Sequence, residues 1–247
     1  MTVKLARWSL HFYALPYRRE IIWANAVERE GTFALLLIEG DNGKQGVAEG
    51  TIKSTWSGVS PNSLRAAFED FLMPKLQGVD IASAVAVKQA LAGIPENALA
   101  KGMIDSAVWT LHAATIGVPL WKLWGGAVGA ANSAASGAAS SVNNEVNLTW
   151  AITRQPPAVM AAEAAEVCAR YGFGTLKVKG GQGVATDLQA LREIRAALKK
   201  SSGDEVILYV DANSAYQREE AAAYVQAIAD AGAVVAEDPC QIGRAHV

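Results

Sequence analysis

The second half of the chain repeats one pattern, in which a short apolar stretch is followed by a longer segment whose apolar residues have helical spacing. The strand candidates are Val146–Ile152, Thr175–Lys179, Val206–Asp211 and Val234–Glu237, and the helix candidates between them are Pro157–Tyr171, Ala185–Lys199 and Arg218–Ala231. Alternation of strands and helices is typical of a parallel β-sheet, because each helix returns the chain to the start of the next strand. A (βα) barrel and an open doubly wound sheet both satisfy this pattern.

The first 125 residues follow a different order, with strands first and helices afterwards. The strand candidates are Lys4–Tyr13, Thr32–Ile38 and Gln45–Glu49, and helices are expected from Ser60 to Pro74, over Ile81–Leu91 and over Ala98–Thr115. Asn42-Gly43 predicts a tight turn between the second and third strands, and Tyr17–Glu30 is expected to form a long loop between the first two. We predict an α+β domain with a three-stranded antiparallel sheet, followed by a Gly- and Ala-rich junction at Gly125–Ser141.

The composition excludes several classes of protein. The 22 Lys and Arg residues nearly balance the 24 Asp and Glu residues, and without a basic run the chain lacks the electrostatic footprint of a nucleic-acid binder. No apolar run approaches the roughly 20 residues that span a bilayer, and the N-terminus does not read as a signal or transit peptide. Cys168 and Cys240 signal neither a disulfide framework nor a zinc site. We therefore expect a soluble, cytoplasmic protein with no nucleic-acid or membrane partner.

Charged residues stand at the carboxyl ends of three of the predicted parallel strands. Lys177 and Lys179 lie in the second strand, Asp211 ends the third and Glu237 ends the fourth. Because the carboxyl ends of parallel strands meet at one edge of a sheet, these side chains are expected to converge on one site. The alternation of side chains along a strand also places both lysines on the same face.

Two lysines and two carboxylates at one edge indicate acid–base chemistry beside a metal ion. Repulsion between the ammonium groups, added to burial, predicts a lowered pKa for at least one of the lysines, which would make it a usable base. Carboxylates are the hard oxygen ligands that Mg²⁺ prefers. The structural alternative, in which Lys177 and Lys179 form a solvated strand face and Asp211 caps a helix, does not account for lysines on a strand whose neighbours are buried on both faces.

Together with several other segments, these residues resemble the enolase superfamily, in its mandelate racemase/muconate lactonizing enzyme family and the muconate lactonizing enzyme subgroup. The resemblance covers nearly the whole chain. The matching segments are Gly46-Val47-Ala48-Glu49, Ala107-Val108-Trp109, Gly117-Val118-Pro119-Leu120, Leu123-Trp124-Gly125-Gly126, Lys177-Val178-Lys179, Asp211-Ala212-Asn213 and Glu237-Asp238-Pro239.

This resemblance implies an α+β capping domain that governs substrate specificity, over residues 1–125, followed by an α/β (βα) barrel of the TIM type. Residues 126–240 supply only the first four βα units, which is the first half of a barrel. Residues 241–247 resemble the translation of a sequencing adapter and are expected to be a non-native tail. For a full-length enzyme, the resemblance implies a homo-oligomer.

The resemblance also assigns roles to the charged residues. Lys179 matches the base that removes a proton α to a carboxylate, and Lys177 matches the lysine that tunes it electrostatically. Asp211 and Glu237 match two ligands of a bound Mg²⁺. The implied enzyme is an isomerase or a lyase acting on a small carboxylate substrate by cycloisomerisation, racemisation or epimerisation, or dehydration. A third metal ligand and a second acid/base lysine of the family have no match here, so the chain is expected to be an inactive fragment.

Substrate choice is expected to reside in the loops Tyr17–Ala26 and Thr51–Gly58 of the capping domain. Trp23 and Trp56 offer flat apolar surfaces there, although both could equally serve packing between domains. Asn213 is a further candidate for a substrate contact.

Two other interpretations stay open on the sequence alone. Gly180–Gly183 follows a strand and precedes a helix, as in a dinucleotide-binding loop, but its glycine spacing does not match that fingerprint. The other is a fragment without catalytic activity, since an incomplete barrel leaves open sheet edges.

Overall fold

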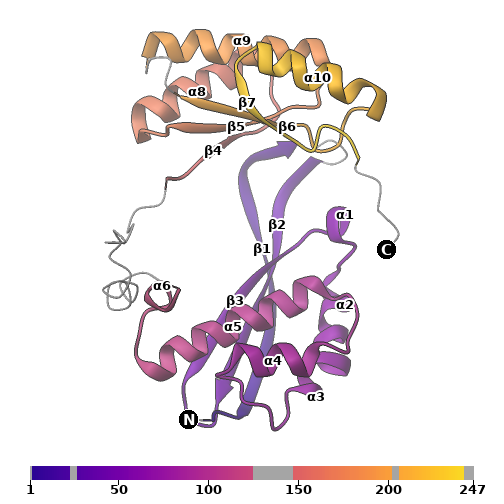
Figure 1. The fold of residues 1–247 in the computed structure, drawn as a ribbon, viewed down its shortest axis with the longest axis vertical. Helices are drawn as coiled ribbons and strands as arrows, with labels where there is room; N and C mark the ends of the chain where they lie inside the picture. The colour runs from indigo at the N-terminus through magenta and orange to yellow at the C-terminus, as the bar shows by residue number, and fades with distance from the viewer. Residues whose placement is uncertain (1, 23–26, 125–146, 202–205, 242–247) are drawn as a thin grey trace, which may run out of the picture. The chain divides into compact units, whose positions relative to one another are not determined.

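The computed structural model describes residues 2–22, 27–124, 147–201 and 206–241. Contacts divide the chain into two compact units (Figure 1). The first unit comprises Met1–Tyr17 and Glu30–Asn144, and the second comprises Arg18–Arg29 and Glu145–Val247. The predicted junction at Gly125–Ser141 lies outside the described residues, as do residues 242–247 of the expected tail.

A three-stranded sheet runs through the first unit, in the order β1 (Leu5–Ile22), β2 (Val27–Gly40) and β3 (Gln45–Ile52). Residues 18–22 of β1 and 27–29 of β2 belong to the second unit. Strands β2 and β3 pair in antiparallel register from Glu39 opposite Gln45 to Thr32 opposite Ile52. The predicted turn between them is present, and Gly43 adopts the left-handed backbone conformation, with φ of 72°, that glycine accommodates without strain.

The prediction of a loop over Tyr17–Glu30 is wrong for most of that range. Strand β1 continues to Ile22 and strand β2 begins at Val27, while residues 23–26 lie outside the described residues. Polar side chains pair across the two strands here, as in the ion pair between Arg29 Nε and Glu20 Oε1 at 2.7 Å. The polar composition therefore marks an exposed two-stranded ribbon, because cross-strand pairs stabilise strands without a buried face.

Seven helical segments follow the sheet within the described residues of the first unit. They are α1 (Ser54–Ser57), α2 (Pro61–Ala66), the π-helical η1 (Ala67–Leu72), α3 (Met73–Lys75), α4 (Ala84–Leu91), α5 (Ala98–Ile116) and α6 (Leu120–Leu123). Ser60 caps α2 and Pro61 occupies its first turn, as predicted. Pro74 does not stop the helical run, because it lies in the first turn of α3, where a missing N–H costs little. The short α1 and α6 were not predicted.

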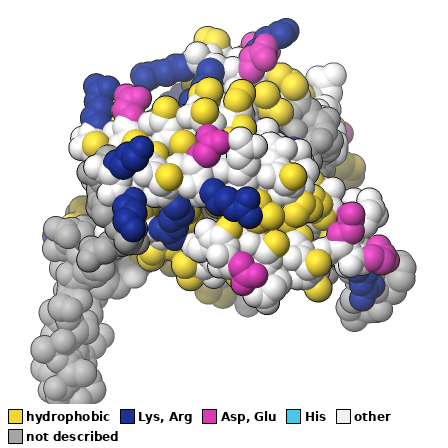
Figure 2. Space-filling model, turned by 90° about the horizontal axis from the view of Figure 1, so that it is seen from above, with side chains coloured by type: hydrophobic (Ala, Val, Ile, Leu, Met, Phe, Trp, Pro, Cys, Tyr) yellow, Lys and Arg dark blue, Asp and Glu magenta, His cyan; other side chains and the backbone are white. Residues whose placement is uncertain are grey.

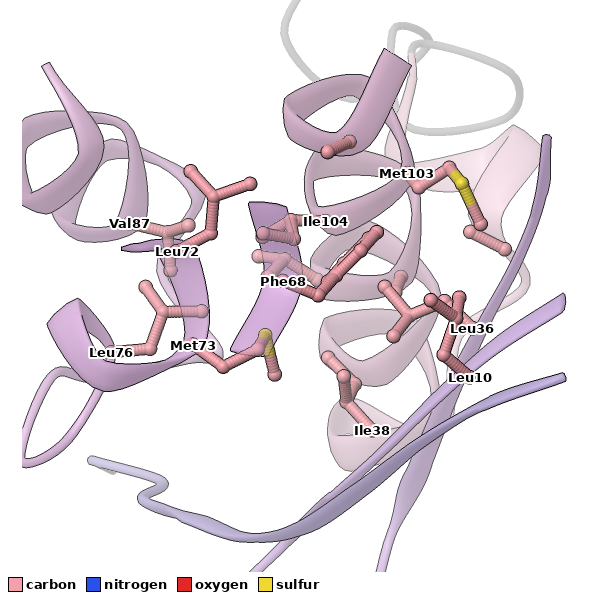
Figure 3. Close-up of a cluster of buried hydrophobic side chains, with 14 of the residues drawn as sticks. Leu10, Leu36, Ile38, Phe68, Leu72, Met73, Leu76, Val87, Met103 and Ile104 are labelled. Atoms are coloured by element: carbon pink, nitrogen blue, oxygen red, sulfur yellow. The ribbon is translucent and has the colours of Figure 1, made fainter. Parts of the chain in front are cut away.

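The core of the first unit lies between the sheet and its helices. Figure 3 shows Leu36 of β2, Phe68 of η1 and Ile104 of α5 among the side chains that converge there. Helix α5 contacts β3 closely, and a Cβ atom on Gly46 would lie 2.0 Å from the carbonyl oxygen of Ala107. Glycine at this position is therefore a condition for the close approach of strand and helix.

Within its described residues, the second unit contains four parallel strands with helices between them, as the alternating pattern predicts. The strands are β4 (Trp150–Ile152), β5 (Thr175–Lys179), β6 (Ile207–Asp211) and β7 (Ala233–Glu237), and the helices are α8 (Pro157–Tyr171), α9 (Val184–Ser201) and α10 (Arg218–Asp230). Each strand pairs with the next one in the chain, in the order β4-β5-β6-β7. This order never reverses, unlike that of a doubly wound sheet, and is the order of a partial barrel.

The helices bury one face of this sheet. Leu176 and Val178 of β5 are buried in a core that includes Met160 of α8 and Leu191 of α9. The opposite face of β5 therefore carries Lys177 and Lys179. In Figure 2, which views the structure from above, basic and acidic side chains are interspersed with hydrophobic ones over the visible face. Among the described residues, no helix has the length and apolar character that crossing a membrane requires.

Candidate active site

The register of the parallel strands brings three charged residues into adjacent positions. Lys179 of β5 stands opposite Asp211 of β6, and Asp211 stands opposite Glu237 of β7. All three lie at the carboxyl ends of their strands. Lys177 is two residues before Lys179 and shares its face, because side chains alternate along a strand. The convergence expected from the sequence is present in the structure.

Ion pairs connect the four side chains. Lys179 Nζ lies 2.5 Å from Asp211 Oδ2, and Lys177 Nζ lies 2.9 Å from the same oxygen. Lys177 Nζ also lies 2.5 Å from Glu237 Oε2, so this lysine bridges two carboxylates. Lys179 is 9% exposed and Asp211 is 1% exposed, so both members of this pair are buried.

The carboxylates shift the pKa of Lys177 in the direction opposite to the lowering that lysine–lysine repulsion predicts. Burial acts to lower this pKa, but hydrogen bonds to Glu237 and Asp211 outweigh burial and raise it. Repulsion between the lysines does not decide the pKa of Lys177, because Asp211 Oδ2 accepts from both ammonium groups and Glu237 Oε2 accepts from Lys177. Burial acts to raise the pKa of Asp211, but hydrogen bonds from Lys179 and Lys177 lower it. Asp211 is therefore ionised at neutral pH, as a metal ligand must be.

Three carboxylates at this edge fit the requirements of a divalent cation. Oxygen atoms of Asp211, Glu237 and Asp238 lie within 4.8 Å of one another. These are hard oxygen donors, which suit Mg²⁺, and two of them, on Asp211 and Glu237, already contact a positive charge, the ammonium of Lys177. Asp238 was not among the predicted ligands, although a second carboxylate directly after Glu237 at a strand end was a usable signal.

Asn213 contacts the lysine–carboxylate pair from the loop after β6. Its Oδ1 atom accepts a hydrogen bond from Lys179 Nζ at 3.3 Å, and its backbone N–H donates to Asp211 Oδ1 at 3.0 Å. Asn213 and Ser214 both adopt left-handed backbone conformations, with φ of 49° and 57°. Such backbone strain in residues other than glycine is common at functional sites.

The structure describes one of the two tryptophans expected to contact substrate. Trp23 lies outside the described residues. Trp56 is in α1 of the first unit, where its side chain is 81% exposed. Packing within the first unit does not account for so exposed a tryptophan.

A buried polar cluster that sequence reasoning missed lies next to the site. Asp187 Oδ2 accepts hydrogen bonds from the Gly181 N–H at 2.7 Å and from the hydroxyls of Tyr216 and Tyr224 at 2.6 and 2.8 Å. Asp187 Oδ1 accepts from the Gln182 N–H at 3.1 Å. The N–H groups that would bind phosphate in a dinucleotide loop are thus bonded to the chain's own carboxylate, which argues against that alternative.

Comparisons with known proteins agree with this architecture. Residues 15–125 match the family described as mandelate racemase / muconate lactonizing enzyme, N-terminal domain, and residues 159–246 match the one described as enolase C-terminal domain-like. The L-Ala-D/L-Glu epimerase of Bacillus subtilis (strain 168) is 26% identical over 232 residues, which are 93% of this chain and 58% of the epimerase. A solved structure of the B. subtilis epimerase in a substrate-liganded complex has a TM-score of 0.82 at 25% identity, covering 96% of this chain and 62% of that one.

The relatives also include a protein named for a different reaction. Muconate cycloisomerase 1 of Rhodococcus opacus is 25% identical over 209 residues, which are 83% of this chain and 51% of the cycloisomerase. The dipeptide epimerase of Enterococcus faecalis V583, solved with Mg and the dipeptide L-Leu-L-Tyr, has a TM-score of 0.82 at 24% identity, covering 98% of this chain and 60% of that one. The chain thus spans between 51% and 58% of the length of the two curated relatives. With matches to both domains of one family and the sheet of a partial barrel, the chain belongs to the mandelate racemase/muconate lactonizing enzyme family of the enolase superfamily.

Proposed function

We propose that this chain contributes to Mg²⁺-dependent removal of a proton from the carbon α to a carboxylate in a small substrate. The observation that carries the proposal is the pairing of Lys179 with Asp211 at 2.5 Å, beside the further carboxylates of Glu237 and Asp238. The named activities of the relatives support it, because epimerisation next to a carbonyl group requires removal and return of a proton at the α carbon.

In this proposal, Lys179 is the base, Lys177 is its electrostatic partner, and Asp211 and Glu237 hold Mg²⁺, with Asp238 as an additional ligand candidate. When bound, Mg²⁺ supplies positive charge that stabilises the negative charge developing on the substrate carboxylate. Asn213, which is bonded to Lys179, would orient the lysine or contact the substrate.

The shared oxygen of Asp211 couples the proposed base to the proposed metal ligands. Lys177 Nζ and Lys179 Nζ both donate to Asp211 Oδ2, at 2.9 and 2.5 Å, and Lys177 Nζ also contacts Glu237 Oε2 at 2.5 Å. The two carboxylates that would hold Mg²⁺ therefore also fix the positions of the two lysines. In its neutral form, the amine of Lys179 can accept a proton from the substrate.

Several outcomes share this first step. Return of the proton to the other face gives racemisation or epimerisation, and attack or loss of a neighbouring group gives cycloisomerisation or dehydration, so the proposed enzyme is an isomerase or a lyase. We propose that the segments Tyr17–Ala26 and Thr51–Gly58, with Trp23 and Trp56, select among carboxylate substrates. A second acid/base lysine is unassigned here, so we expect no turnover from these 247 residues alone.

Titration with Mg²⁺ tests the proposed metal site in the chain itself. Isothermal titration calorimetry should detect a single weak site in the wild type, and Asp211→Asn should weaken it by at least about tenfold, because a charged ligand is lost. Asp230→Asn is the matched control, since Asp230 is an exposed carboxylate of α10. Binding that is absent from the wild type, or unaffected by Asp211→Asn, contradicts the proposal.

A further inference from the structure

A single buried arginine joins the segments that leave the two central strands of the site. Arg154 Nε donates to the carbonyl oxygen of Gly180 at 2.5 Å, and Arg154 Nη2 donates to that of Ala212 at 3.1 Å. Gly180 directly follows Lys179, and Ala212 directly follows Asp211. Arg154 is 5% exposed and comes from the segment after β4.

The contact lies where the ladder between β5 and β6 ends. The Gly180 N–H donates to the Asp211 carbonyl at 2.9 Å, but the Gly180 carbonyl accepts from Arg154, and the Asn213 N–H, beyond the end of β6, donates to Asp211 Oδ1 instead of to that carbonyl. The backbone ladder between β5 and β6 therefore ends at this point, and Arg154 supplies a link between the two segments beyond it. A planar guanidinium fixes two acceptors in one geometry, which a lysine ammonium does not do.

The local sequence is built around this arginine. A Cβ atom on Gly181 would lie 2.4 Å from Arg154 Nη2, and Gly181 has a φ of 84°, so a larger residue is excluded on both grounds. Asp187 holds the same turn from the other side through the N–H groups of Gly181 and Gln182. Gly180 and Gly181, in the segment that resembled a nucleotide loop, thus allow Asp187 and Arg154 to approach the backbone.

We propose that Arg154 is a positioning residue that holds the carboxyl ends of β5 and β6 together and thereby keeps Lys179 and Asp211 paired. The hydrogen bonds of Arg154 to Gly180 and Ala212 support its effect on the Lys179–Asp211 pair. Its importance for proton abstraction rests on the proposed function. Loss of the guanidinium should let the two strand ends separate without removing any group of the site itself.

The chain offers a matched control at the other end of the same sheet. Arg195 of α9 donates from Nη1 to the carbonyl of Val206 at 2.6 Å and from Nη2 to that of Gly232 at 2.7 Å. These carbonyls directly precede β6 and β7. Arg195 thus makes the same kind of link, and its removal should loosen the sheet away from the site.

Lysine labelling tests the proposal without a metal or a substrate. The chain is exposed briefly to acetic anhydride, and the acetylation rate at Lys179 is measured by mass spectrometry relative to that at the exposed Lys88. Arg154→Lys should raise this ratio by about fivefold or more, the factor that corresponds to one hydrogen bond. Arg195→Lys should leave the ratio within about twofold of the wild type, because its link lies at the distant edge.

The outcomes separate positioning from general stability. An unchanged ratio in Arg154→Lys, or an equal rise in Arg195→Lys, overturns the proposal. Arg154→Gln is the second variant, and failure of both Arg154 variants to fold while Arg195→Lys folds shows a general structural role and also overturns it.

A Mg²⁺ titration of the same variants distinguishes this inference from the proposed function. If the wild type binds Mg²⁺, Arg154→Lys should weaken binding by about fivefold, as a loss of one orienting contact. If the wild type does not bind, the proposed function fails, and the labelling ratio still decides whether Arg154 positions Lys179.

Discussion

Lys179 and Asp211 stand opposite each other in the β5–β6 register, and their side chains form a buried ion pair with an Nζ–Oδ2 distance of 2.5 Å. The pair joins two residues that lie a full βα unit apart in the chain. Its place at the carboxyl edge of a parallel sheet is where enzymes of this architecture build their sites.

Removing the charge of Asp211 should destabilise the second unit as well as weaken metal binding. Asp211→Asn leaves two ammonium groups facing a neutral acceptor, and breaking a buried pair in this way costs about 3 kcal/mol. Urea unfolding followed by circular dichroism measures the loss, with Asp230→Asn as the exposed control. A loss no larger than that of the control would contradict the view that Asp211 neutralises both lysines.

Glu163 should make stability depend on pH. Its carboxylate, 10% exposed, accepts hydrogen bonds from Arg19, Trp150 and Gln155 at 2.6, 2.8 and 2.9 Å. Burial acts to raise its pKa, but these hydrogen bonds lower it below the ordinary 4.5. A lowered pKa stabilises the folded state above the unfolded pKa, and this contribution is lost as the pH falls through the folded pKa.

Glu163→Gln should therefore lower the free energy of unfolding by about 1 to 2 kcal/mol at pH 7 and by less at pH 3. Urea titrations at several pH values measure the difference. Glu166→Gln is the control, because Glu166 lies on the same helix and forms an exposed ion pair, with 3.7 Å between its Oε1 and Arg170 Nη1. A constant difference between the wild type and Glu163→Gln across this range would refute the prediction.

Two glycines of the first unit should respond to alanine in opposite directions. Gly46→Ala places a Cβ atom 2.0 Å from the backbone oxygen of Ala107, and forced separation of β3 and α5 should cost about 2 kcal/mol. Gly102→Ala meets nothing within 4 Å in the middle of α5, and should stabilise the helix by about 0.5 to 1 kcal/mol. Thermal unfolding compares the two variants, and the same sign for both would disprove the packing argument.

Trp56 should affect substrate choice more than stability. Its side chain is 81% exposed, so in a full-length enzyme that contains this segment Trp56→Ala should change the unfolding free energy by less than about 0.5 kcal/mol. The variant should change kcat/KM for the preferred carboxylate by about fivefold or more, through loss of an aromatic contact. Trp121→Ala, at another exposed tryptophan, is the control. A large loss of stability with unchanged kcat/KM would favour packing between domains.

Sequence patterns predicted the elements of the second unit well where the chain carries strong local signals. Helix α8 has its predicted bounds, Pro157–Tyr171, since a proline begins it and Gly172, with φ of 72°, ends it. The ribbon at Tyr17–Glu30 was misread because its strands are stabilised by cross-strand pairs and lack the alternation of buried and exposed residues.

Some features of the candidate site could likewise be predicted from the sequence, and others could not. Strand parity was enough to bring Lys177, Lys179, Asp211 and Glu237 together, because it depends only on the period of a strand. Arg154 left no pattern in the sequence, since its partners are two backbone carbonyls from separate segments. The raised pKa of Lys177 could not be predicted from the sequence either, because the direction of the shift depends on which groups contact its ammonium.

Exchange of the substrate α-proton with solvent tests the central claim most directly. A full-length enzyme that contains this segment is incubated with its carboxylate substrate in D₂O, and deuterium at the α carbon is followed by nuclear magnetic resonance. Lys179→Ala should slow exchange by at least about a hundredfold, the effect of losing a general base, while Lys199→Ala, at an exposed lysine of α9, should exchange like the wild type. Exchange by Lys179→Ala at the wild-type rate would contradict the assignment of Lys179 as the base.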